Sequence, residues 1–210
     1  MDVLLTGFEP FGGELTNPSW DAVQAVRSDG HRLTKLRLPC VFGESVAAVR
    51  DALAVRRYDL VVCVGQAGGR DGVTPERVAV NLDDARIPDN AGGQPIDEPV
   101  VPGGPAAYFT GLPVKACVAA LAADGIPASV SHSAGTFVCN HVFYGLMHLV
   151  ATEHPGVRGG FVHVPFSPEQ AEAGGHPSLP VATTARALEL IVRTSLSTSV
   201  DLRATAGTLH

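Results

Sequence analysis

Apolar residues along the chain alternate between two kinds of spacing, which predicts alternating strands and helices. Short apolar runs typical of strands occur at 3–5, 36–38, 60–64, 128–131 and 160–164. Apolar residues three or four positions apart indicate helices that start at 17–18 or cover 46–53, 114–121, 138–152 and 181–192. This order predicts one α/β domain over residues 1–210, with helices on both faces of a sheet.

Residues 65–104 interrupt this regularity. The segment is rich in Gly, Pro, Asp and Asn, and irregular segments of such length in a compact domain are usually functional or disordered. Four apolar residues within it, Val78, Val80, Leu82 and Ile87, favour an ordered loop that contains short strands.

Composition and charge narrow the class of protein. The chain has 210 residues, of which 45% are hydrophobic and 17% charged, as expected for a globule with a sizeable core. A net charge of -6 and the lack of a Lys/Arg run argue against a nucleic-acid surface. The N-terminus has no basic leader, and no apolar run approaches the roughly 20 residues of a membrane helix. The 4 cysteines are far apart and form no zinc motif. We therefore expect a cytoplasmic protein with reduced thiols and no metal.

Cys139 stands out among the cysteines. A small turn at 134–137 that contains Gly delivers it to the start of a predicted helix. Amides and dipole at a helix start favour the thiolate, so we expect a reactive thiol. The alternative is core packing, since cysteine is among the most buried residues. Cys63 and Cys117 fit that alternative, and Cys40 has no activating neighbour in the sequence.

Polar residues near strand ends supply possible partners for Cys139. Active sites of open α/β sheets lie at the carboxyl ends of strands. Gln66 ends one predicted strand, Cys139 follows the strand at 128–131, and His163 lies near the end of the strand at 160–164. Glu76, in the irregular segment, is a candidate third member.

Each of these residues has a simpler interpretation. His163 fits a half-buried histidine bonded to backbone, and Glu76 fits a solvated acid beside Arg77. His141 is two positions beyond Cys139 and would not face it on a helix. The glycine-rich run 65–70 follows a strand but lacks the spacing of phosphate-binding loops, so it favours close approach to a small ligand.

Several longer segments resemble a known family. Residues 5–13 with 17–20, 64–70 with 74–77, 84–90, 134–141 and 159–165 resemble, in this order, the signature segments of the pyroglutamyl-peptidase I (pyrrolidone-carboxylate peptidase) cysteine peptidases. The resemblance covers nearly the whole chain. It implies a three-layer αβα sandwich with a mostly parallel mixed sheet, a triad of Cys139, His163 and Glu76, no cofactor, and commonly a homotetramer.

The resemblance also implies the reaction. Cys139 would attack the amide carbonyl after an N-terminal pyroglutamyl residue, His163 would carry the proton, and Glu76 would orient His163. Similarity to the family suggests that Arg86 assists at the oxyanion. The matching substrate-binding positions are Phe8, Phe11, Gln66, Ile87, Phe137 and Val138.

The substrate slot has a physical rationale. Pyroglutamate is a flat, uncharged lactam that suits an apolar slot with a few amide partners. A free N-terminal ammonium would enter such a slot at a cost of roughly several kcal/mol. Phe8 and Phe11 flank Pro10 in a predicted glycine-rich loop, which favours a slot over core packing.

Three other functions remain as alternatives. A thiol amidase of the same architecture could act on another small lactam or amide. A non-catalytic binding module could keep the same pocket. A transferase resembling nucleoside phosphorylases rests on layered architecture alone, which is weak support, and the sequence holds no phosphate motif.

Overall fold

The computed structural model describes residues 1–171 and 175–207. The strands are β1 (Asp2–Phe8), β2 (Arg32–Leu38), β3 (Leu60–Gln66), β4 (Thr74–Pro75), β5 (Val78–Val80), β6 (Ala107–Phe109) and β7 (Arg158–Val164). The helices are α1 (Pro18–Ala25), α2 (Glu44–Val55), α3 (Val114–Ala123), α4 (Val138–Thr152), α5 (Pro168–Ala171) and α6 (Val181–Ser197). None of the helices in the described ranges is long and apolar enough to cross a membrane.

The main sheet has the strand order β2-β1-β3-β7-β4. β1 runs parallel to β2 and β3, and β3 runs parallel to β7. β4 is antiparallel to β7. The mostly parallel mixed sheet is therefore confirmed. Its register sets Gly65 of β3 beside His163 of β7, at the carboxyl ends of both strands.

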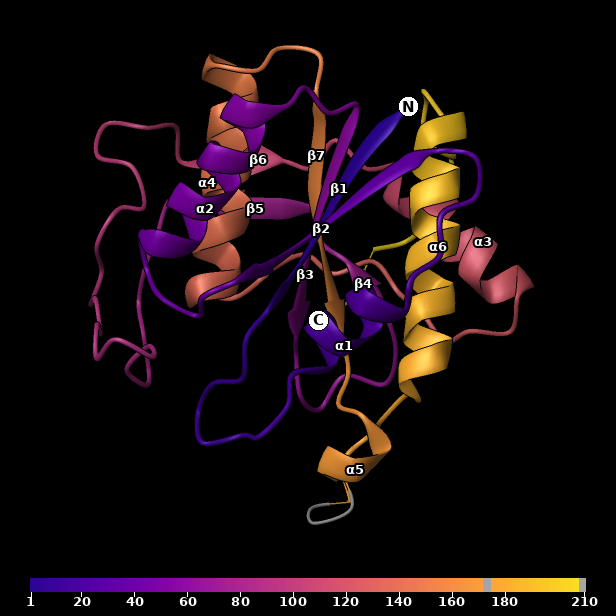
Figure 1. Ribbon diagram of the computed structural model, residues 1–210, viewed down its shortest axis with the longest axis horizontal. Helices are drawn as coiled ribbons and strands as arrows, with labels where there is room; N and C mark the ends of the chain where they lie inside the picture. The colour runs from indigo at the N-terminus through magenta and orange to yellow at the C-terminus, as the bar shows by residue number, and fades with distance from the viewer. Residues whose placement is uncertain (172–174, 208–210) are drawn as a thin grey trace.

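Helices cover both faces of this sheet (Figure 1). α1, α3 and α6 lie together on one face, while α2 and α4 pack together on the other. Successive strand residues point to opposite faces of the sheet. Leu5 and Val62 belong to the hydrophobic cluster on the face covered by α1, α3 and α6. Leu4 and Val61 belong to the cluster on the face covered by α2 and α4. The predicted three-layer sandwich is confirmed.

The strand predicted at 128–131 does not form as a regular strand. The segment runs parallel to residues 73–77 and makes only isolated bridges, at Ala128 and Ser131. Backbone bonds join Ser129 N to Val73 O and Ser131 N to Pro75 O. The backbone hydrogen bond that a regular ladder would have between these two is missing, because Pro75 has no N–H to donate. A proline in the partner segment thus interrupts the ladder that the apolar pattern predicts.

The irregular segment is ordered, as its apolar residues predict. β5 pairs with β6 in a small antiparallel ladder. Farther along, the backbones of Asp83 and Glu98 exchange two hydrogen bonds of 2.7 and 3.0 Å. The Asp89 carboxylate closes a turn by accepting from the amides of Ala91 and Gly93. These contacts order the segment that carries Arg86 and Ile87, and the Phe42 amide, which donates to Asp89 Oδ2 at 2.9 Å, ties it to the domain.

Candidate active site

His163 and Glu76 form a buried pair at the carboxyl end of β7. Thr74 of β4 pairs with His163, and the Glu76 amide donates to Phe161 O at 2.9 Å. This pairing brings Glu76 Oε1 to 2.7 Å from His163 Nδ1. Glu76 is 0% exposed and His163 is 3% exposed. Glu76 is therefore not a solvated surface acid.

Burial and charge define the protonation of this pair. Burial by itself raises the pKa of Glu76, but the hydrogen bond and charge of His163 and the charge of Arg70 bring that pKa below its ordinary value. Burial lowers the pKa of His163, and this outweighs the opposite influence of Glu76. At neutral pH the imidazole is neutral, and its Nδ1–H donates to the Glu76 carboxylate. The Nε2 lone pair is then free to take a proton.

Cys139 lies in the first turn of α4. Gly135 has a φ of 78°, a conformation that glycine adopts readily, and the chain turns there before the helix begins. Phe137 is the N-cap and makes no side-chain cap bond. The Cys139 amide has no acceptor in the described part of the chain, as expected for a first-turn N–H. It is available to a developing oxyanion.

The sulfur of Cys139 lies directly over Gly65. A Cβ atom built on Gly65 would be 2.7 Å from Cys139 Sγ and 2.8 Å from the Phe161 ring. Registered neighbours on parallel strands share a face, so the side chain of His163 points the same way as that Cβ position. The Phe161 and His163 rings, 4.9 Å apart, lie on this face as well. The thiol and the imidazole therefore occupy adjacent positions on one face of the sheet.

Burial of the Cys139 thiol opposes the thiolate that the helix start is predicted to favour. Burial raises the pKa of the Cys139 thiol, and the neighbouring Cys40 and Glu76 raise it further, while Arg70 opposes them. The helix start favours the charged form of this partly buried thiol, whereas burial and Glu76 disfavour it. A neutral thiol beside a neutral imidazole needs proton transfer at the moment of attack.

A cavity of about 340 Å³ brings together two of the predicted substrate residues, Ile87 and Phe137, with Arg86, the residue predicted to assist at the oxyanion. Asp84, Gly135 and Thr136 complete its lining. The Phe137 ring packs on Phe11, with ring centres 6.1 Å apart. Arg86 is exposed.

The other predicted substrate residues lie outside that lining. Phe8 is the last residue of β1 rather than part of a loop, and it is buried against Phe161 with ring centres 6.4 Å apart. Val138 is fully buried. Gln66 ends β3, and its Oε1 accepts from Gln170 Nε2 at 3.2 Å. Phe11 lies outside the lining as well, and the roles of all the predicted substrate residues stay predictions.

The remaining cysteines fit core packing. Cys63 and Cys117 are fully buried, and Cys40 is 3% exposed. Burial raises the pKa of Cys63 to about 12, of Cys117 to about 11 and of Cys40 to about 12. His141 is engaged elsewhere, since Asp83 and the Gly43 amide occupy its two nitrogens. It is no base for Cys139.

Sequence reasoning missed several residues that build the site. Arg70 donates to Glu76 Oε1 at 2.6 Å. Asn140 is fully buried and ties the first turn of α4 to the backbone of Val80 and Leu82. Phe42 packs edge-on against Phe137, with ring centres 5.4 Å apart. None of these contacts follows a helical or strand spacing, so the sequence holds no local signal for them.

Known proteins of the same size and fold resemble this chain closely. The pyroglutamyl peptidase family profile matches residues 1–198. The pyrrolidone-carboxylate peptidase of Streptomyces coelicolor is 61% identical over 213 residues, and that of Cupriavidus necator is 55% identical over 215, each match covering 99% of both chains. The crystal structure of pyroglutamyl peptidase I from Bacillus amyloliquefaciens has a TM-score of 0.95 and 49% identity, covering 97% of this chain and 99% of that one. The chain therefore belongs to the pyroglutamyl peptidase family.

Proposed function

We propose that this enzyme hydrolyses the amide bond after an N-terminal pyroglutamyl residue, using Cys139, His163 and Glu76 as its triad. The observation that carries the proposal is the placement of Cys139 Sγ over Gly65, beside a neutral His163 that is bonded to a buried carboxylate. A nucleophile, a base and a group that orients the base are the parts of a covalent acyl-transfer site. The identity of the acyl group, pyroglutamyl, is inferred from the names of the family and of its relatives.

Acylation proceeds as the thiol loses its proton. Cys139 Sγ forms a bond to the pyroglutamyl carbonyl carbon while its proton passes to His163 Nε2. The carbonyl oxygen becomes an oxyanion, which the Cys139 amide stabilises. Glu76 stabilises the imidazolium that forms. The C–N bond then breaks, and His163 Nε2 returns the proton to the departing amine.

Deacylation uses the same residues. His163 Nε2 takes a proton from water, whose oxygen attacks the thioester carbon. The C–S bond breaks, the sulfur regains a proton from His163, and pyroglutamate leaves. No step needs a cofactor.

The slot for the lactam forms around Phe137, Phe11 and Ile87. These side chains present an apolar wall at the helix start that carries the nucleophile. Gln66, at the end of β3, supplies an amide to the lactam, and Arg86 supports the oxyanion. Phe11, Ile87 and Phe137 offer a charged N-terminal amine no acceptor, and the one carboxylate in the cavity lining, Asp84, is exposed, so ordinary aminopeptidase substrates are disfavoured.

The test compares three arylamides that differ only in the acyl group. We expect rapid hydrolysis of the pyroglutamyl arylamide and little hydrolysis of the prolyl and alanyl ones. Equal rates of hydrolysis of the three arylamides would reject the specificity for a lactam. No turnover of any of the three would favour a binding module. Excess iodoacetamide should abolish turnover, whereas a metal chelator should leave it unchanged.

We also propose a homotetramer, as the resemblance implies, and a cytoplasmic location, as the N-terminus and the separated cysteines suggest. Light scattering of the purified chain tests the assembly. A molar mass of a single chain at micromolar concentration would reject it.

A further inference from the structure

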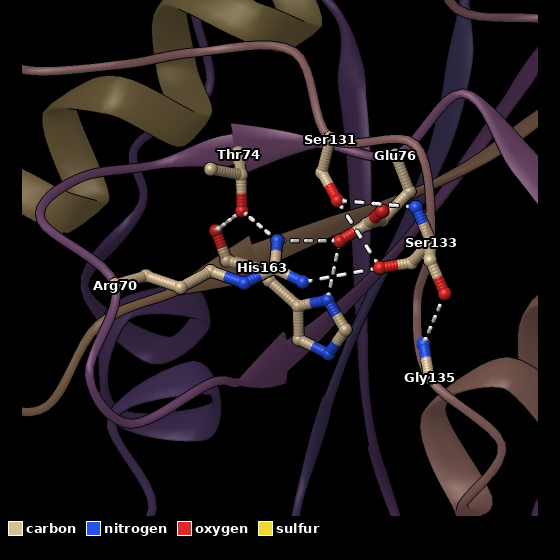
Figure 2. Close-up of polar contacts among 7 residues, drawn as sticks. All are labelled: Arg70, Thr74, Glu76, Ser131, Ser133, Gly135 and His163. Atoms are coloured by element: carbon tan, nitrogen blue, oxygen red, sulfur yellow. Dashed lines mark hydrogen bonds and ion pairs between the residues drawn. The ribbon is translucent and has the colours of Figure 1, made fainter. Parts of the chain in front are cut away.

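The guanidinium of Arg70 connects three separate parts of the active site (Figure 2). Nη1 donates to Glu76 Oε1 at 2.6 Å and also to Thr74 Oγ1. Nη2 donates to Ser133 O at 3.2 Å. The Arg70 side chain is only 26% exposed. This half-buried cation thus contacts the acid and the segment that leads to the nucleophile.

The Glu76 carboxylate makes its hydrogen bonds to Arg70 and His163 through a single oxygen. Oε1 accepts from Arg70 on one side and from His163 Nδ1, at 2.7 Å, on the other. Oε2 is buried and has no hydrogen-bond partner among the described residues. A fully buried carboxylate beside a neutral imidazole needs a compensating charge, and Arg70 supplies it.

The second terminal nitrogen of Arg70, Nη2, contacts the segment that leads to Cys139. The Ser133 carbonyl accepts from Ser131 Oγ as well as from Arg70. Ser133 Oγ in turn accepts from the amide of Gly135, where the chain turns toward α4. Figure 2 shows this series of contacts beside the Glu76–His163 pair. Arg70 therefore ties the turn before the nucleophile to the acid.

We infer that Arg70 is a positioning residue, which holds the Glu76 carboxylate on His163 and fixes the turn at Ser133 that delivers Cys139. The inference rests on the proposed function, because it assigns Arg70 a part in that same triad. A second route supports it: Thr74, which accepts from Arg70, donates to the His163 backbone carbonyl at 3.5 Å. Arg70 thus braces both members of the pair.

The charges around His163 give the inference a measurable sign. Two charged side chains influence it, Glu76 by raising its pKa and Arg70 by lowering it. The titratable groups on neighbouring elements, Cys139 on α4 and Cys63 on β3, are neutral thiols. Without Arg70, the negative charge of Glu76 would stabilise the imidazolium form of His163 with no opposing positive charge, and the pKa of His163 would rise. The base would then stay protonated up to a higher pH.

The experiment measures kcat and KM for the pyroglutamyl arylamide against pH in two variants. In Arg70→Met, which removes the charge, we expect the acid limb of kcat/KM to move to higher pH than in the wild type. kcat should fall about 10- to 100-fold because the base and the nucleophile lose their alignment, while KM stays near the wild-type value. Arg70→Lys keeps the positive charge but loses the planar guanidinium that donates to several acceptors at once. The acid limb of this variant should therefore stay near that of the wild type, while its kcat remains reduced.

The matched control removes the ion pair between Arg186 of α6 and Asp124, which caps α3, on the other side of the sheet from Cys139. Arg186 forms two bonds with Asp124 and is 45% exposed, so Arg186→Met should leave the pH profile unchanged. A second readout without turnover is the rate at which iodoacetamide modifies Cys139 at each pH. It should show the same displacement of the acid limb in Arg70→Met.

The outcomes separate this inference from the proposed function. An Arg70→Met variant that folds and keeps the wild-type acid limb would overturn the inference. A raised KM with unchanged kcat would also overturn it, since Arg70 would then contact the substrate. If the wild-type enzyme fails to cleave the substrate, or Cys139→Ala cleaves it normally, the proposed function fails instead. Melting temperatures of both Arg70 variants identify any loss of folding.

Discussion

Gly65 and Cys139 are in a contact that leaves no room for a side chain on Gly65. A Cβ at Gly65 would come within 2.7 Å of Cys139 Sγ. The nucleophile thus lies against the backbone of a central strand, next to the strand that carries its base. Its position is defined by the sheet as well as by the helix that bears it.

Gly65→Ala should therefore displace the sulfur. We expect kcat/KM to fall by about 100-fold or more and the free energy of unfolding to fall by about 1–3 kcal/mol from overpacking. Gly160→Ala is the matched control, because its Cβ would meet Leu112, 2.4 Å away in the other hydrophobic cluster. Comparable losses of kcat/KM in the two variants would show that overpacking alone explains the effect.

Cys139→Ser should lose nearly all turnover. A hydroxyl is a weaker nucleophile than a thiol and gives up its proton less readily, so we expect kcat to fall by about 1,000-fold or more. Cys117→Ala, on the opposite face of the sheet, should keep its kcat. Turnover by Cys139→Ser at the rate of the wild type would reject Cys139 as the nucleophile.

The pH profile should reflect the burial of His163. Only the neutral imidazole can accept the thiol proton, and burial lowers its pKa below the ordinary value of 6.5. Protonation therefore begins at a lower pH than in an exposed histidine, and the acid limb of kcat/KM should lie below 6.5. A stopped assay from pH 4 to pH 8 measures it. An acid limb above 6.5 would contradict a base whose pKa is lowered by burial.

Phe137→Ala should weaken discrimination among acyl groups. The ring lines the candidate slot and packs on Phe11 and Phe42. Its loss should lower the ratio of pyroglutamyl to prolyl arylamide hydrolysis by about 10-fold or more. Phe109→Ala, which alters a side chain that is 72% exposed, is the control. An unchanged ratio in Phe137→Ala would remove this ring from the slot.

The regular elements could be predicted because each depends on local spacing. The apolar strand at 60–64 and the helix at 138–152 appear in the structure as β3 and α4. Pro75 shows where such reasoning fails, because its missing N–H interrupts the pairing of a different segment, 128–131. The spacing of apolar residues within a segment does not indicate which other segment it will pair with.

The candidate triad could be named from the sequence through the resemblance, but its electrostatics could not. The helix start at Cys139 suggests a lowered pKa, whereas enclosure by the sheet and by neighbouring acids raises it. Arg70 and Glu76 are neighbours only because the chain loops back between them. Burial and charge contacts of this kind arise from tertiary structure and leave no periodic signal.

The neutral thiol of Cys139 has a consequence for the idle enzyme. Peroxides and other small oxidants react with thiolates far faster than with thiols. Burial, which raises the pKa of Cys139, therefore slows the conversion of this thiol to sulfenic acid between turnovers. Its reactivity appears when a carbonyl lies against the sulfur, so the substrate itself switches the nucleophile on.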